Sequence, residues 1–267
     1  MTIPHEVSRD ISKVFSYLSS HLWQSKSKGN ECLRSFCLDL SRILPNPVFV
    51  KIGANDGVTG DPCSDILLAN LNWRGLLIEP VPDCFDRLKA NFKDAGRFSW
   101  EQVAVGSAEG EITFYYVDPK ANQSLPSLPV WFDQLGSFDR NHIVKHLDGV
   151  LEPFILERKV PVWPLSALLK KSNIQEVHLL HIDTEGYDYE VLKTLDFSLH
   201  APLSIFIEHK HVANTQKTEM RRLLRKEGYS LQDCGGDYFA VKSADYRRLQ
   251  RHYQHSAVTW RTNVPVG

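Results

Sequence analysis

The sequence predicts a doubly wound α/β domain with a mostly parallel sheet, on three observations. Short apolar runs typical of strands alternate with helical patterns along the chain, which indicates βαβ units. The run at 177–182 is apolar almost without interruption, as expected of a strand buried on both faces. A glycine-rich turn at 53–57 directly follows the first strand, where folds of this class bind ligands.

Two helices are predicted before the sheet. Apolar residues recur at helical spacing in the first: Ile11, Val14, Phe15, Leu18 and Leu22. The polar stretch 25–30 interrupts the pattern, and a second helix over 33–43 ends at Pro45 and Pro47 because proline cannot continue a helix. These helices form a homodimer contact or cover the sheet, and the sequence leaves both possibilities open.

Strands and helices then alternate through the main domain. Strands are predicted at 48–52, 75–78, 103–105, 112–117 (antiparallel), 160–163, 177–182 and 203–207, with a closing hairpin at 231 and 238–241. Helices are predicted at 62–72, 82–94, 133–147, 165–171, 187–195 and 215–227. The chain therefore divides into an N-terminal helical extension (1–47), a main domain (48–243) and a C-terminal tail (244–267). The irregular segment 118–150 is expected to be an insertion over the sheet.

The charge balance and the cysteine content of the chain argue against several classes of function. The 267 residues include 31 Lys+Arg and 32 Asp+Glu, a net charge of -1, so no nucleic acid partner is expected. The five cysteines show no CxxC spacing, which argues against a cysteine zinc site and against a disulfide framework. Reduced thiols, no visible secretory signal and no apolar run of membrane-spanning length together predict a cytoplasmic protein without a membrane span.

The first candidate binding motif is the turn Gly53-Ala54-Asn55-Asp56-Gly57. Glycine allows a sharp turn and a close approach of backbone N–H groups to a ligand, although an ordinary strand-to-helix turn would have the same composition. A dinucleotide-binding GxGxxG motif would need glycine at 55 and 58, where this chain has Asn55 and Val58. An NAD-dependent nucleotide-sugar enzyme is therefore disfavoured.

Acidic residues follow three of the predicted strands. Glu79 comes 26 residues after Gly53, where a carboxylate can accept hydrogen bonds from ribose hydroxyls, unless it is a surface acid before a proline turn. Asp183 and Glu185 follow the buried strand 177–182. Carboxylates there are costly to desolvate, so they either serve the function or cap the helix that follows. Glu208 and His209 end the strand 203–207, and a polar loop tip is the alternative there.

Three segments resemble the FkbM family of methyltransferases: Val50–Gly57, Ile78-Glu79-Pro80, and Ile182-Asp183-Thr184-Glu185-Gly186-Tyr187-Asp188. The resemblance implies a class I methyltransferase fold, Rossmann-like, with a seven-stranded sheet whose last strand is antiparallel. It implies S-adenosyl-L-methionine as the cofactor and O-methylation of a sugar or other small-molecule acceptor. It also assigns a set of residues to the cofactor: Gly53, Ala54, Asn55, Asp56, Gly57, Glu79 (ribose), Val103, Ala104 (adenine) and Asp183.

The chain departs from the family pattern at Lys51. Members carry an acidic residue two positions before the first glycine, where it helps to hold the amino group of the cofactor. Asn55, Asp56 or Asp183 is expected to replace that contact. A catalytically weak or inactive cofactor-binding module of the same fold is the alternative that this departure keeps open.

The candidate catalytic residues are Asp183, Glu185, Glu208 and His209. A hydroxyl is a poor nucleophile while protonated, so a base or a metal must assist transfer. In one route Asp183 or His209 removes the proton, and in the other Asp183 and Glu208 bind Mg²⁺. The segment 118–150 contacts the acceptor or forms a lid without contact, and its candidate contact residues are Gln123, Ser124, Trp131, Phe132, His142 and His146.

Overall fold

The computed structural model describes residues 26–93, 96–242 and 244–248. The helix predicted from the pattern Ile11 to Leu22 and most of the tail 244–267 lie outside the described residues. Within the described part, no helix combines the length and the apolar character that crossing a lipid bilayer would require.

The central sheet has seven strands in the order β10-β11-β9-β8-β1-β2-β3. Along the chain these are β1 (Val48–Ile52), β2 (Arg74–Ile78), β3 (Phe98–Glu101), β8 (Leu179–Ile182), β9 (Ser204–Glu208), β10 (Ser230–Asp233) and β11 (Asp237–Val241). The pairs that join β3, β2, β1, β8 and β9 are parallel, whereas β11 is antiparallel to both of its neighbours. The predicted mostly parallel sheet with an antiparallel last strand is thereby confirmed.

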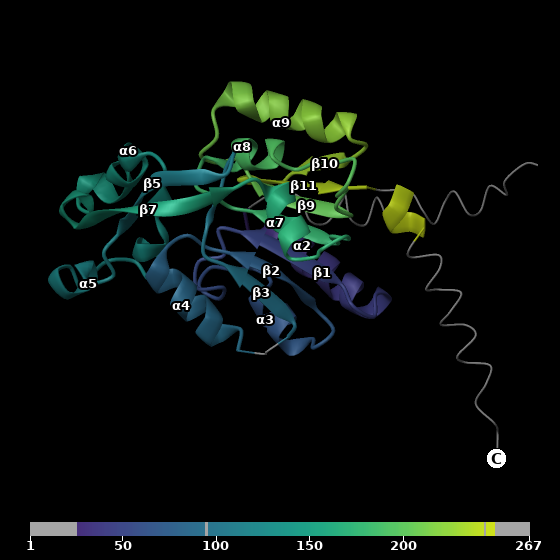
Figure 1. The fold of residues 1–267 in the computed structure, drawn as a ribbon, viewed down its shortest axis with the longest axis horizontal. Coiled ribbons are helices and arrows are strands. Elements are labelled where there is room, and N and C mark those ends of the chain that lie inside the picture. Colours follow the sequence, from purple (N-terminus) through teal and green to yellow (C-terminus); the bar gives the residue numbers. More distant parts are fainter. Residues whose placement is uncertain (1–25, 94–95, 243, 249–267) are drawn as a thin grey trace, which may run out of the picture.

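Helices cover both faces of this sheet (Figure 1). One layer consists of α2 (Lys26–Ile43), α3 (Ser64–Ala69) and α4 (Pro82–Asn91), and the other of α7 (Leu165–Lys171), α8 (Asp188–Lys193) and α9 (Asn214–Lys226). Side chains alternate across each strand, so Phe49 packs with the first layer while Val50 and Ile52 pack with the second. Every residue of β1 is buried, as a central strand of a three-layer domain requires.

A smaller sheet and several short helices lie to one side of the central sheet (Figure 1). Its order is β4-β7-β5-β6, with β4 (Ala104–Val105), β5 (Gly110–Val117), β6 (Gly136–Ser137) and β7 (Ile155–Trp163). The helices are α5 (Ala121–Ser124), η1 (Phe132–Gln134), α6 (Arg140–Val144), η2 (His146–Gly149) and η3 (Glu152–Phe154). They enclose a hydrophobic cluster of their own: Val117, Ala121, Phe132, Leu135, Ile143 and Leu151.

Three predicted elements were wrong. The third central strand is β3, an edge strand without an apolar run, and the predicted strand 103–105 instead contributes β4 to the smaller sheet. The predicted helix 133–147 is broken into η1, β6 and α6, because Gly136 joins a strand and the Asp139 side chain caps a new helix at Asn141 N. The second helix begins earlier than predicted, because residues 26–30 of the polar stretch belong to α2, whose apolar face on the sheet stabilises it.

Strand register aligns the carboxyl ends of the central strands. Ile52 pairs with Ile78 and with Ile182, and Ile182 pairs with Ile207. The residue after each of these paired positions therefore lies along one edge of the sheet: Gly53, Glu79, Asp183 and Glu208.

Candidate functional site

A pocket with about 470 Å³ of empty space, part of it open to solvent, lies at this edge of the sheet. Its walls come from the ends of β1, β2 and β8 and from the smaller sheet: Ile52, Gly53, Asn55, Ile78, Glu79, Pro80, Val103, Ala104, Val105, Phe114, Gln134, Gly136, Asp183, Thr184 and Glu185. The strand order reverses at β1, which pairs with β2 on one side and β8 on the other. Ligands of open α/β sheets bind at such a reversal.

Gly53 allows the turn after β1 to contact the loop after β8. Its φ is +74°, and a Cβ at this position would stand 1.7 Å from the carbonyl oxygen of Asp183. The backbone N–H of Gly53 donates to Ile78 O at 3.1 Å, and that of Asp183 donates to Ile52 O at 3.0 Å. Only glycine has both the conformation and the space that this close approach requires.

The remaining residues of the glycine-rich turn have different surroundings. Asn55 lines the pocket with a φ of +50°. Ala54 is buried in the core on the α2–α4 side, and a Cβ on Gly57 would meet the side chains of α4 at 2.6 Å. The carboxylate of Asp56 accepts hydrogen bonds from Val58 N, Thr59 N and Thr59 Oγ1 within its own turn. Ala54, Asp56 and Gly57 thus shape the turn without lining the pocket.

Glu79 is a buried carboxylate at the pocket wall. Only 3% of its surface is exposed, and its two oxygens accept hydrogen bonds from Asn55 N and Val81 N, each at 2.8 Å. Burial raises the pKa of Glu79 to about 7, against the opposing effect of these two donors. Each oxygen keeps a further lone pair, so the group can accept hydrogen bonds from a ligand.

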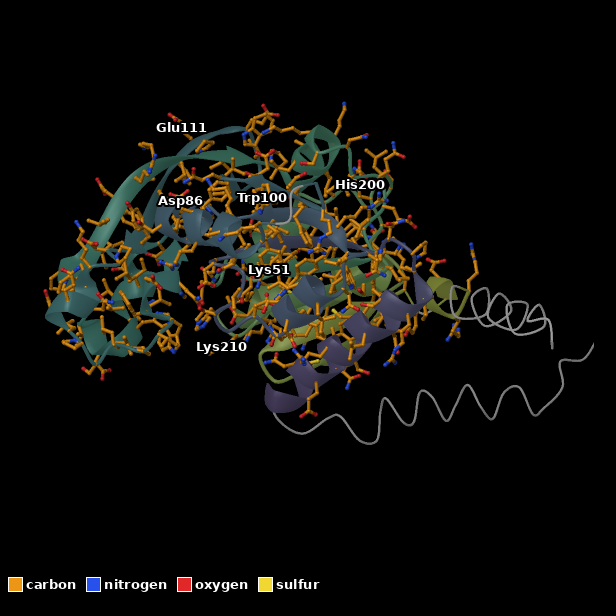
Figure 2. The ribbon with its side chains drawn as sticks, turned by 90° about the horizontal axis from the view of Figure 1, so that it is seen from below. Lys51, Asp86, Trp100, Glu111, His200 and Lys210 are labelled. Atoms are coloured by element: carbon orange, nitrogen blue, oxygen red, sulfur yellow. The ribbon has the colours of Figure 1, made fainter. Side chains whose placement is uncertain are left out.

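Lys51 lies inside the molecule, as Figure 2 shows, and does not line the pocket. Its ammonium forms a buried ion pair with Asp61, a residue of the loop before α3. His181 stands opposite Lys51 on the neighbouring strand, and burial together with the Lys51 charge lowers the pKa of His181 to about 3. The unusual lysine is therefore neutralised by Asp61 beneath the turn.

Asp188, which residue pattern alone did not single out, supports the loop after β8. It is fully buried at the start of α8 and accepts hydrogen bonds from Thr184 N at 2.9 Å and Gly186 N at 3.0 Å. Burial, and then the charge of Asp183, raises the pKa of Asp188 to about 8. Its position in the segment that resembles the family motif was the available sequence signal.

Glu208 brings a further acid to the same region. Its Oε2 atom is buried and has no hydrogen-bond partner. Burial, followed by the charges of Asp183 and Glu185, raises the pKa of Glu208 to about 10. The predicted acids Asp183, Glu185 and Glu208 are thus brought close enough to influence one another, and this edge of the sheet favours a cation.

His209 has different surroundings. Its ring stacks on Tyr238 with centroids 3.9 Å apart, and its Nε2 lies 3.3 Å from Asp233 Oδ1, so it packs against β10 and β11 rather than lining the pocket. The neighbouring His211 instead places its Nε2 3.4 Å from Glu185 Oε2. The two histidines after β9 therefore lie in different places: His209 against Tyr238, and His211 beside Glu185.

The described residues contain two groups that could hold a metal, and both include Glu185. One comprises His142, His146 and Glu185, and the other Glu185, Glu208 and His211. Asp183 belongs to neither of these groups of three, and the pairing of Asp183 with Glu208 around Mg²⁺ stays a prediction. Histidine ligands from distant parts of the chain could not be identified by spacing alone.

The insertion contributes to the pocket through residues that the sequence did not indicate. Gln134 and Gly136 line it, whereas Phe132 is buried in the core of the insertion. Trp131 is 39% exposed, and the predicted contacts Gln123 and Ser124 are exposed on α5.

A family model, the methyltransferase FkbM domain, matches residues 51–231. The chain belongs to the FkbM methyltransferase family. Its sheet order, with the antiparallel last strand, is that of the class I methyltransferase fold, so the predicted family and fold are both confirmed. No curated protein matches this FkbM-family chain in sequence.

Several solved structures are similar to part of this FkbM-family chain. Precorrin-6y C5,15-methyltransferase from Geobacter metallireducens is 15% identical, with a TM-score of 0.35 over 75% of this chain and 72% of that one. Fibrillarin from Methanococcus jannaschii, a pre-rRNA processing protein, is 10% identical, with a TM-score of 0.39 over 75% and 68%. Aeropyrum pernix fibrillarin with natively bound S-adenosyl-L-methionine is 11% identical, with a TM-score of 0.34 over 78% and 72%.

Proposed function

We propose that this FkbM-family chain uses S-adenosyl-L-methionine to methylate a hydroxyl oxygen of a small molecule, with a sugar as the acceptor class. The observation that carries the proposal is the buried Glu79 carboxylate beside the Gly53 turn, in a pocket with about 470 Å³ of empty space.

The lining of the pocket fits the cofactor part by part. Glu79 would accept hydrogen bonds from the two ribose hydroxyls through its remaining lone pairs. Val103, Ala104 and Phe114 give an apolar wall suited to adenine. Asn55 would hold the amino group of the cofactor, because the carboxylate of Asp56 is already engaged within its own turn. Asn55 would thus replace the acidic contact that is missing at Lys51.

The residues at the end of β8 suit proton removal from a hydroxyl. Bound S-adenosyl-L-methionine supplies an electrophilic methyl group. Asp183, which lines the pocket next to Gly53, would accept the proton of the acceptor hydroxyl. Glu185, which also lines the pocket, adds negative charge nearby, and this favours binding of the positively charged sulfonium. Gln134 of η1 and Gly136 of β6 would exclude water from the same space.

Neither alternative function gains support from these surroundings. Lys51 does not line the pocket and its ammonium is paired with Asp61, so it gives no reason for an inactive module. Asn55, in place of the second glycine of a dinucleotide motif, still argues against NAD. All five cysteines, which fall within the described residues, are free and buried, and this supports a reducing compartment such as the cytoplasm.

Isothermal titration calorimetry with S-adenosylhomocysteine tests the cofactor assignment. We expect binding by the unaltered protein, no binding of NAD, and a loss of affinity of about 10-fold to 100-fold in Glu79→Ala, as for lost hydrogen bonds to a charged group. The matched control is Glu101→Gln, an acid on the next strand that pairs with Lys171. Unchanged affinity in Glu79→Ala would overturn the proposal. Transfer of a labelled methyl group to a panel of sugars then tests the acceptor class.

A further inference from the structure

Three histidines gather around Glu185 at the side of the pocket. They come from α6 (His142), η2 (His146) and the loop after β9 (His211). The Nε2 atoms of His142 and His211 lie 3.3 Å and 3.4 Å from the same Oε2 of Glu185. The three imidazole centroids are separated by 4.7, 5.2 and 5.5 Å.

These distances are longer than those of direct ion pairs. A charged nitrogen that donates to a carboxylate usually approaches to about 2.7–2.9 Å. Ligand atoms about 2.1 Å from a tetrahedral zinc ion are instead separated by about 3.4 Å, and the imidazole centroids of such ligands by about 5.2 Å. The 3.3 Å between His142 Nε2 and Glu185 Oε2 therefore fits two ligands of one metal ion. The 3.4 Å and 5.2 Å separations involve His211, whose ligand atom lies outside the group that His142, His146 and Glu185 form.

Hydrogen bonding prepares His146 to act as a ligand. Its Nδ1 lies 2.8 Å from the carbonyl oxygen of His142, one turn earlier. A carbonyl oxygen only accepts, so Nδ1 of His146 carries the proton and its Nε2 keeps a lone pair. Histidines that bind metals commonly donate the other ring N–H to a backbone carbonyl in this way.

The backbone around the cluster is strained. Leu147 and Asp148, directly after His146, have φ values of +50° and +53°, and Glu185 has a φ of +53°. Residues other than glycine rarely adopt this conformation, and such strain concentrates at functional sites. Glu208, whose Oε2 is buried without a partner, has its ligand atom within 4.8 Å of those of Glu185 and His211.

From this arrangement we infer that His142, His146 and Glu185 bind one divalent transition-metal ion of the zinc class, with the fourth coordination position open. The ligand atoms of these three residues lie within 4.8 Å of one another. Two imidazoles and one carboxylate select zinc or a similar ion rather than Mg²⁺, which prefers oxygen ligands. His211, beside the same Glu185 oxygen, would orient the carboxylate.

The open position would face the pocket, because Glu185 also lines it. An acceptor hydroxyl bound there would lose its proton more readily, and Asp183 would receive that proton. This role in transfer rests on the proposed function, whereas metal binding itself does not. Binding is therefore measured first, without cofactor or acceptor.

The test uses the full chain, stripped with a chelator, re-supplied with Zn²⁺ in excess Mg²⁺ and then dialysed. We expect elemental analysis to find one zinc per chain, and Co²⁺ substitution to give the intense visible bands of a four-coordinate ion. The double variant His142→Gln/His146→Gln should lose the metal, and His211→Gln should weaken binding by about 10-fold to 100-fold, as for residues that orient a ligand.

His200→Gln is the control, since His200 belongs to neither metal-capable group, and Figure 2 shows it well apart from Lys210, the neighbour of His211. Thermal unfolding of each metal-free variant confirms that it remains folded. Failure of the folded, unaltered protein to retain Zn²⁺ would overturn the inference, as would full retention by the double variant. Zinc binding without methyl transfer would contradict the proposed function alone, and transfer at full rate by the stripped enzyme would contradict the role of the metal.

Discussion

The carbonyl oxygen of Asp183 occupies the space that a Cβ on Gly53 would need, at a separation of 1.7 Å. The turn that follows β1 is thereby held directly against the loop that follows β8. One residue at this contact belongs to the proposed cofactor site and the other is the proposed base. Their relative position is consequently fixed by backbone rather than by flexible side chains.

Gly53→Ala should displace both loops. We expect the free energy of unfolding to fall by about 1–3 kcal/mol, as for overpacked sites, and S-adenosylhomocysteine binding to be lost. Gly60→Ala is the matched control, because Gly60 has the same φ of +74° but open space where its Cβ would stand. Chemical denaturation of both variants separates the steric contact from the conformational effect. Equal destabilisation would show that the Asp183 contact contributes nothing.

Lys51→Met should destabilise the fold without affecting the cofactor. Removing one partner of a buried ion pair leaves Asp61 uncompensated, which costs about 3–5 kcal/mol. In the double variant Lys51→Met/Asp61→Leu we expect most of this loss to be recovered. Denaturation curves measure the stability, and the thermal shift caused by S-adenosylhomocysteine reports on binding. A weakened shift in the folded double variant would instead indicate that Lys51 contributes to the cofactor site.

The affinity for S-adenosylhomocysteine should rise between pH 6 and about pH 8. Burial raises the pKa of Glu79 to about 7 from the usual 4.5, so the folded chain keeps a proton that the unfolded chain releases between these values. Glu79 therefore lowers the free energy of unfolding as the pH rises through this window. Ribose hydroxyls donate more strongly to the ionised carboxylate, so binding should strengthen as the pH rises through the folded pKa of about 7. Calorimetry of Glu79→Gln should show a flat profile, and an identical slope in this variant would exclude Glu79 as the cause.

Asp183→Asn should separate binding from transfer. We expect kcat to fall by about 10²-fold to 10⁴-fold, the usual contribution of a general base. Affinity for S-adenosylhomocysteine should change little, because the proposed ribose and amino contacts come from Glu79 and Asn55. Single-turnover transfer of a labelled methyl group measures the first quantity and calorimetry the second, with Glu101→Gln as the control. Undiminished kcat in Asp183→Asn would assign the proton to another group.

Most of the central sheet could be predicted because each buried strand leaves a short apolar run in the local sequence. Buried strands such as β8 require continuous apolar runs, and α7 was predicted with the bounds that the structure has. The edge strand β3 escaped detection because its exposed and half-buried positions carry no such run. The insertion was predicted least well, since its short helices depend on packing around Phe132 and Ile143 rather than on periodicity.

The candidate site was predictable where it follows directly from a strand end. Glu79 and Asp183 come immediately after aligned strands, and they line the pocket. Side-chain direction beyond the strand was not predictable: the His209 ring stacks on Tyr238, whereas His211 lies beside Glu185. His142 contacts Glu185 although the two residues are 43 positions apart, so no local sequence pattern could predict this contact.

The hydrophobic cluster of the insertion shares no member with the two clusters that flank the central sheet. Amino-acid changes inside that small cluster can therefore reshape the wall around Gln134 while the adenosine-facing half keeps its form. Under the proposed function, changes confined to this cluster would alter which acceptors the enzyme takes while cofactor binding is kept.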